Sequence, residues 1–308
     1  MPHLTSDASG VFVISVTPFT EDGAIDWDSL DRVTDFYLAA GADGLTILGM
    51  MGEAHKLTQV EARMVAARVI KRAGTVPVVV GVSAPGFAAI SELSVAVMDM
   101  GAAGVMVTPA VGLRTDTQIV AYYHQVAEAT GPSVPIVIQD FPLATGVQMS
   151  DVAIATIIDD VSQIVMLKHE DWPGLAKISA IRTAEKGGRR HISILCGNGG
   201  LFLPEEIARG ADGAMTGFGF PEMMVDVTRL AQAGDMDRAQ DIFDAYLPLV
   251  RYEQQPGAGL AVRKHVLATR GAIASPALRK PGTGVSDTVR GEVNRLITRQ
   301  ENRLKKLG

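Results

Sequence analysis

The sequence predicts an α/β protein: a (β/α)₈ TIM barrel followed by a C-terminal helical extension. Eight short apolar runs alternate with longer segments of helical spacing, as expected for parallel strands joined by helical crossovers. A doubly wound sheet is the alternative that this alternation leaves open. It usually shows a glycine-rich phosphate loop after the first strand, whereas here the first run leads into Thr17-Pro18-Phe19-Thr20.

The predicted strands are apolar along most of their length, which is typical of strands packed on both faces. Alternating apolar and polar residues would instead indicate a sheet with one face in water. In chain order the eight runs are Val11–Val16, Leu45–Gly49, Pro77–Val82, Val105–Thr108, Pro135–Gln139, Ile164–Lys168, Ile192–Cys196 and Ala214–Thr216. Eight such units suit a closed barrel.

Several of the intervening helices have recognisable ends. Asp26 is a predicted cap for a helix that runs to about Ala40, with Gly41 as its stop. The T-x-x-E pattern at residues 58–61 predicts a capping box, and Ser150 precedes another helical run. These caps support the assignment of the segments between strands as helices.

The alternation ends near Pro221, so we expect residues 1–221 to form the catalytic barrel and residues 222–308 a helical extension packed on it. This tail is too long to be only the eighth helix of the barrel. Its predicted helices are Met223–Gln232, Asp237–Leu247, Leu260–Thr269 and Val285–Lys305. Such an extension either packs on the barrel or builds a subunit contact.

Composition and charge narrow the class of protein. The 308 residues are 47% hydrophobic and 20% charged, with a net charge of −6, which argues against a nucleic-acid partner. The chain has no apolar run of about 18 residues, so we expect no membrane span. Its single cysteine, Cys196, fits a reducing compartment. We therefore expect a cytoplasmic enzyme.

Lys168 is the most informative single residue, because it is the only lysine that closes an apolar strand. In a TIM barrel the chemistry lies at this end of the strands. Burial disfavours a charged amine, and a neutral amine can attack a ketone to form a Schiff base. The alternative from position alone is a structural lysine whose head reaches solvent, paired with Glu170.

Other strand ends offer binding groups. The second strand leads into Gly49-Met50-Met51-Gly52-Glu53, where two glycines let main-chain N–H groups converge on an anion such as a 2-oxo acid carboxylate. The alternative is a tight turn with glycine for geometry alone. We also expect Gly197, after the seventh strand, and Met215, in the eighth, to line the substrate site. We expect no metal and no organic cofactor, because the histidines lack metal-ligand spacing.

These segments, in this order, resemble the dihydrodipicolinate synthase/N-acetylneuraminate lyase family of class I aldolases. The matches run from Gly10 to about Pro221 and include Val16–Phe19, the turn at Gly49–Glu53, Val107–Pro109, Lys168 and Gly210–Thr216. The resemblance implies a barrel with a helical extension, Lys168 as the Schiff-base lysine, the Gly49–Glu53 turn as the carboxylate site, and a homo-oligomer, either a tetramer or a dimer.

The departures from the family pattern concern proton transfer. Gln139 stands where the family has its acid–base tyrosine, and an amide cannot shuttle a proton. Met50 and Met51 replace a pair of threonines, Val111 stands near the position of a second tyrosine, and Ala144 replaces an arginine of the synthases. A dihydrodipicolinate synthase is therefore not expected. The Gln139-Asp140-Phe141-Pro142 segment is similar to the 2-keto-3-deoxy-L-arabonate dehydratase branch.

The function expected from the sequence is Schiff-base dehydration of a 2-keto-3-deoxy sugar acid. In this hypothesis Lys168 forms the imine and Gln139 orients a water or a substrate hydroxyl. The proton carrier is Asp140, Glu53 or Glu170. One alternative is a pyruvate-dependent aldolase or synthase. The other is a non-catalytic protein that binds 2-oxo acids. Lys168 argues against this alternative, because a carboxylate can be bound without it.

Overall fold

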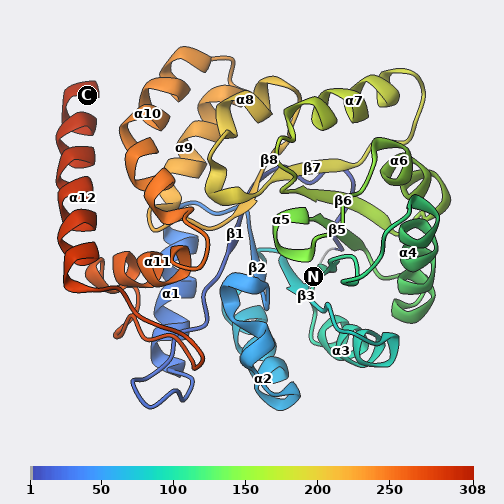
Figure 1. Cartoon of the computed structure of the whole chain (residues 1–308), viewed down its shortest axis with the longest axis horizontal. Coiled ribbons are helices and arrows are strands. Elements are labelled where there is room, and N and C mark those ends of the chain that lie inside the picture. Colours follow the sequence, from blue (N-terminus) through green and yellow to red (C-terminus); the bar gives the residue numbers. More distant parts are fainter. Residues whose placement is uncertain (1–2) are drawn as a thin grey trace.

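A computed structural model describes residues 3–308, and its strands close into one barrel (Figure 1). All eight neighbouring pairs are parallel, and β1 pairs with β8 to complete the ring. The strands are β1 (Gly10–Ile14), β2 (Gly44–Ile47), β3 (Val78–Gly81), β4 (Gly104–Val107), β5 (Ile136–Asp140), β6 (Ile164–His169), β7 (Ser193–Cys196) and β8 (Gly213–Thr216). The predicted (β/α)₈ barrel is confirmed, with strand ends shifted by one or two residues.

Helices surround the barrel and follow its strands. They are α1 (Trp27–Ala39), α2 (Gln59–Ala73), α3 (Phe87–Asp99), α4 (Asp116–Thr130), α6 (Asp151–Asp160), α7 (Leu175–Lys186), α8 (Leu203–Ala208) and α9 (Pro221–Gln232). The predicted caps are present: Asp26 accepts from the N–H of Ser29, Thr58 and Glu61 form a reciprocal capping box, and Ser150 caps α6. The short helix α5 (Pro142–Thr145) follows β5.

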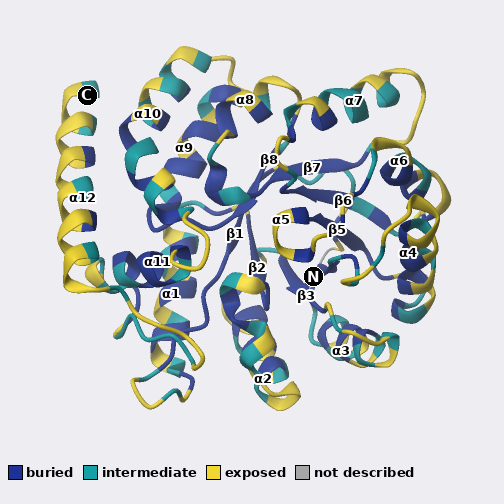
Figure 2. Ribbon diagram, viewed as in Figure 1, coloured by how far each residue is buried: buried dark blue, intermediate teal, exposed yellow. Residues whose placement is uncertain are grey.

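The core has two layers, and Figure 2 shows the strands between them as buried. Residues such as Phe12, Met106, Met166 and Met215 pack against one another in a cluster separate from the larger one. The larger cluster joins the strands to the surrounding helices. Alternate strand residues serve the two layers, because successive side chains of a strand point to opposite faces.

The expected division of the chain after residue 221 stays a prediction. Helix α9 directly follows β8 and packs against β1 and β8, so it serves as the eighth outer helix. Pro221 is the first residue of α9, so the expected boundary falls at the start of this helix. The extension comprises α10 (Met236–Glu253), α11 (Gly259–Thr269) and α12 (Asp287–Leu307), and α12 forms one outer edge of the molecule (Figure 1). Within the described residues, no helix is long and apolar enough to cross a membrane.

Candidate active site

Lys168 and Gln139 lie side by side at the carboxyl ends of two neighbouring strands. They are register partners across β5 and β6, so their side chains point to the same face of the sheet. Lys168 is 5% exposed and Gln139 is 3% exposed. Both line one small cavity, of about 40 Å³, at this end of the barrel. The sequence prediction that these two residues share a site agrees with this geometry.

Glu170 connects the two. It lies two residues after Lys168, and its Oε2 is 2.9 Å from Lys168 Nζ. The same oxygen accepts a hydrogen bond of 2.7 Å from Gln139 Nε2. The Glu170 side chain is 7% exposed, so little water competes with these partners. One buried carboxylate oxygen therefore serves both the amine and the amide.

Gly197, at the end of β7, leaves room for this carboxylate. A Cβ atom built on Gly197 would lie 2.1 Å from Cγ of Glu170, which is far inside van der Waals contact. The neighbouring Asn198 donates from Nδ2 to the main-chain carbonyl of Glu170 at 3.1 Å. Gly197 therefore supports Glu170, whereas the sequence had suggested direct substrate contact.

Asp140 lies on the other side of the barrel wall. Its Oδ2 accepts from Lys177 Nζ at 2.7 Å, and Lys177 also contacts Asp171 at 2.6 Å. Burial raises the pKa of Asp140 to about 6 although Lys177 opposes the shift, and burial lowers the pKa of the adjacent His169 to about 4. Asp140 follows Gln139 in the strand and so points away from Lys168. Asp140 therefore lies outside the Lys168 cavity, contrary to the expectation that it takes part in catalysis.

The Gly49–Glu53 segment forms a tight turn over the cavity. Met50–Gly52 make one 3₁₀ turn, flanked by Leu48 and Glu53 with φ of 55° and 53°. Non-glycine residues with positive φ often mark functional turns. Among the described residues, the main-chain N–H groups of Met50 and Met51 have no hydrogen-bond partner. The expectation that these two donors bind a carboxylate stays a prediction.

Glu53 does not contact this cavity, contrary to the expectation that it binds substrate. Its side chain is fully buried, with Oε1 2.6 Å from Lys264 Nζ of α11 and Oε2 2.7 Å from Lys56 Nζ. The main-chain N–H of Arg279 donates to Oε2 as well, at 3.1 Å. Lys264 further donates to the carbonyl of Thr17 at 2.8 Å. The contacts of Glu53 therefore link the Gly49–Glu53 turn to the C-terminal extension.

The cavity also includes groups that the sequence analysis did not assign. Met215 packs in the cluster described above, while Thr216 and Gly217, its successors, line the cavity. The residues that line the cavity and were not expected are Ile14, Phe141, Asn198, Gly199, Thr216, Gly217, Gln254 and Arg263. The first six of these residues lie at or just after the carboxyl ends of strands, and this sequence position could have indicated that they line the cavity. Gln254 and Arg263 come from the extension, where no local pattern marks them.

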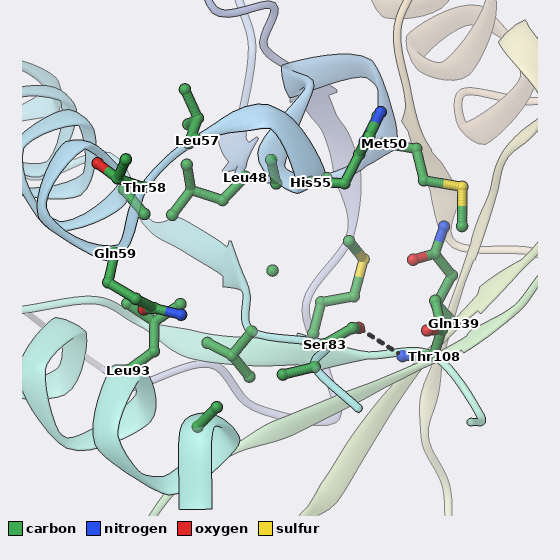
Figure 3. Close-up of a pocket in the computed structure, with 18 residues that line it drawn as sticks. Leu48, Met50, His55, Leu57, Thr58, Gln59, Ser83, Leu93, Thr108 and Gln139 are labelled. Carbon is green, nitrogen blue, oxygen red and sulfur yellow. Dashed lines mark hydrogen bonds between the residues drawn. The ribbon is translucent and has the colours of Figure 1, made fainter. Parts of the chain in front are cut away.

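A larger cavity, of about 260 Å³, adjoins the first (Figure 3). Gln139 and Met50 line both, and Figure 3 shows them on the same side of the larger cavity. Its other walls include His55 and Ser83, whose hydroxyl accepts the N–H of Thr108 at 2.9 Å.

No metal-ligand cluster occurs in the part of the chain that the structure describes: no three histidine, cysteine or carboxylate side chains are placed to hold an ion. The expectation of an enzyme without a metal or organic cofactor stays a prediction.

Comparison with known proteins gives a consistent set of relatives. Residues 7–300 match the dihydrodipicolinate synthetase family. An L-2-keto-3-deoxyarabonate dehydratase of Azospirillum brasilense is 30% identical over 289 residues, or 92% of each chain. The crystal structure of a dihydrodipicolinate synthase from Rhodopseudomonas palustris is 55% identical, with a TM-score of 0.96 over 97% of this chain and 100% of that one. YagE of Escherichia coli, solved with pyruvate, is 24% identical with a TM-score of 0.86 over 95% and 98% of the chains, and shares the fold.

We predict that Lys264→Met destabilises the protein by about 3 kcal/mol, because it removes a partner from the fully buried Glu53. The free energy of unfolding in urea measures the effect. Lys71→Met, at an exposed position of α2, is the matched control and should change stability by no more than about 0.5 kcal/mol. Equal stability of the two variants would show that Glu53 does not depend on Lys264.

Proposed function

The chain belongs to the dihydrodipicolinate synthetase family, and we propose that it dehydrates a 2-keto-3-deoxy sugar acid. Membership of this family of Schiff-base lyases confirms the expectation of an enzyme. The resemblance to a 2-keto-3-deoxyarabonate dehydratase supports the choice of reaction. The homo-oligomer and the cytoplasmic location stay predictions.

The observation that carries the proposal is the single oxygen of Glu170 that contacts both Lys168 and Gln139. A carboxylate can exchange protons, whereas the amide at the family's tyrosine position cannot. Glu170 is therefore the proton carrier in this proposal. Gln139 is a positioning residue, because its amide holds the carboxylate against the amine.

The reaction follows from these positions. Lys168 passes a proton to Glu170 and attacks C2 of the substrate as a neutral amine. One proton from the attacking nitrogen and the proton held by Glu170 pass to the C2 oxygen, which leaves as water, so that Glu170 is a carboxylate again. The protonated imine acidifies C3, and Glu170 removes a C3 proton to give an enamine. The enamine expels the C4 hydroxyl, which takes that proton from Glu170 and leaves as water. Hydrolysis of the imine frees Lys168, so the net change is the loss of one water.

The substrate carboxylate is bound by the turn after β2 in this proposal. The free N–H groups of Met50 and Met51 provide two donors on the wall of the cavity that contains Lys168. Main-chain donors need no reorganisation during the reaction, which suits an anion-binding group. The two methionine side chains offer no hydroxyl for a proton relay.

A pyruvate-dependent aldolase or synthase is the second candidate. The structural relative named as a dihydrodipicolinate synthase, at 55% identity, supports it. Against it stand Gln139, Val111 and Ala144, at positions where the synthases carry proton-relay or aldehyde-binding groups. Val111 is 81% exposed in this chain and has no ionisable group.

We predict that pyruvate and borohydride add one pyruvyl group to the chain, at Lys168. Reduction fixes the imine, so intact mass reports the adduct directly. Lys168→Ala should lose it, whereas Lys186→Ala, at an exposed position of α7, should retain it. Persistent labelling of Lys168→Ala would place the imine on another lysine.

We predict that Glu170→Gln lowers dehydration of 2-keto-3-deoxyarabonate by about 10²- to 10⁴-fold, the usual contribution of a general acid–base group. The variant should still form the pyruvate adduct at saturating pyruvate, since Lys168 remains. Glu205→Gln, exposed on α8, is the matched control. Full activity of Glu170→Gln would transfer the proton step to another group.

We predict poor condensation of pyruvate with aspartate semialdehyde. The missing relay should keep turnover far below the roughly 1–10³ s⁻¹ that is ordinary for enzymes. The measurement compares this condensation with dehydration of 2-keto-3-deoxyarabonate under the same conditions. Ordinary turnover in the condensation, without dehydration, would show that the protein is a synthase.

A further inference from the structure

A buried guanidinium of the C-terminal extension, that of Arg263, forms part of the wall of the Lys168 cavity. Arg263, on α11, is 1% exposed and lines the same cavity as Lys168. Its Nε donates to Oε1 of Glu253 at 2.5 Å. Its Nη1 is buried and has no hydrogen-bond partner among the described residues. Buried donors are nearly always satisfied, so this one needs an explanation.

A second buried donor also lacks a hydrogen-bond partner among the described residues. Gln254, the C-cap residue that follows α10, lines the cavity, and its Nε2 is buried without a partner in the described part of the chain. The two side chains approach from different elements of the extension. Two unpaired donors on one cavity wall indicate an acceptor that a ligand brings.

Two glycines leave room for the side-chain donors of Arg263 and Gln254. A Cβ on Gly217, after β8, would lie 2.5 Å from Nη1 of Arg263. A Cβ on Gly199, after β7, would lie 1.9 Å from Nε2 of Gln254. Any larger residue at either place would push the donor aside. The loops after β7 and β8 thus admit both donors to the cavity.

The charges favour an uncharged acceptor. The fully buried Glu253 balances Arg263, and its Oε2 also accepts the N–H of Gly219 at 3.1 Å. Glu170 likewise balances Lys168. A second carboxylate on the substrate would add an unbalanced negative charge to a buried site, which is costly. A hydroxyl oxygen accepts a hydrogen bond without adding charge.

We infer that Arg263 Nη1 and Gln254 Nε2 bind hydroxyl oxygens at the end of the substrate remote from its 2-oxo group. This inference rests on the proposed function and names the part of the site that selects a hydroxylated chain. Loss of either donor weakens binding of hydroxylated 2-oxo acids by roughly tenfold to a hundredfold. Binding of pyruvate, which has no such end, stays unchanged.

The experiment measures half-saturation of borohydride trapping with three probes: pyruvate, 2-keto-3-deoxyarabonate and 2-oxopentanoate, a chain of equal length without hydroxyls. Trapping does not require turnover. If the wild-type protein traps 2-keto-3-deoxyarabonate without dehydrating it, the proposed reaction fails while the inference is still tested. Kinetic constants for dehydration provide a second readout, in which KM should rise more than kcat falls.

The variants are Gln254→Leu, which leaves the ion pair intact, and Arg263→Lys, which keeps a cation beside Glu253. The matched controls are Gln255→Leu and Arg251→Lys, both at exposed positions. The expected result is weaker trapping of 2-keto-3-deoxyarabonate only, with pyruvate and 2-oxopentanoate unchanged within about twofold.

Other outcomes would overturn the inference. Equal weakening for all three probes would mean a structural role for these side chains, and no change would mean that they do not face the substrate. Tighter binding of 2-oxoglutarate than of 2-keto-3-deoxyarabonate, lost in Arg263→Lys, would assign the donors to a carboxylate. A selective loss in His55→Ala instead would place the hydroxylated end in the neighbouring cavity.

Discussion

The two-residue repeat of a β-strand decides which polar groups meet in this molecule. Along β6, Lys168 faces the cavity, the next residue faces the surrounding helices, and Glu170 returns to the cavity. The register of β5 against β6 then sets Gln139 beside Lys168. A slip of one residue between β5 and β6 would turn Lys168 and Glu170 together to the face opposite Gln139, and the carboxylate would lose the amide.

The same repeat builds a second buried polar group behind the first. Asp140 and His169 are register partners and lie on the helix side of β5 and β6, where Lys177 of α7 pairs with Asp140. This pairing joins α7 to the strands that carry Gln139 and Lys168. Gln139 and Lys168 are thus supported by an ion pair that they do not touch, which is how rigid sites are commonly held.

The sequence was sufficient where the deciding signals are local. Continuous apolar runs located all eight strands, and the position of Lys168 at a strand end located the cavity. Asp140 was assigned a catalytic role because it lies near Gln139 in sequence, although alternation excludes adjacent residues from one face. The same rule places Glu170 on the face of Lys168, whereas Glu53 is held away from the cavity by Lys264.

Long-range contacts account for what the sequence did not reveal. Glu53 was expected to bind substrate because it belongs to the turn, but its partner Lys264 lies 211 residues away. Arg263 and Gln254 reach the cavity from helices that no strand-end rule covers. Arg263 and Lys264 are consecutive on α11, yet one enters the cavity wall and the other holds the turn, so the extension completes the site at two points.

The two carboxylates near the cavity are paired with different cations: Glu253 with Arg263, and Glu170 with Lys168. Arginine stays protonated in proteins, so Arg263 keeps its positive charge beside Glu253 throughout a reaction. In the proposed reaction, Lys168 and Glu170 are the pair of residues lining the cavity that exchanges a proton. Transfer of one proton between them creates a neutral amine without altering the total charge. A buried site can therefore generate its nucleophile with little electrostatic cost, provided that Gln139 keeps the carboxylate in place.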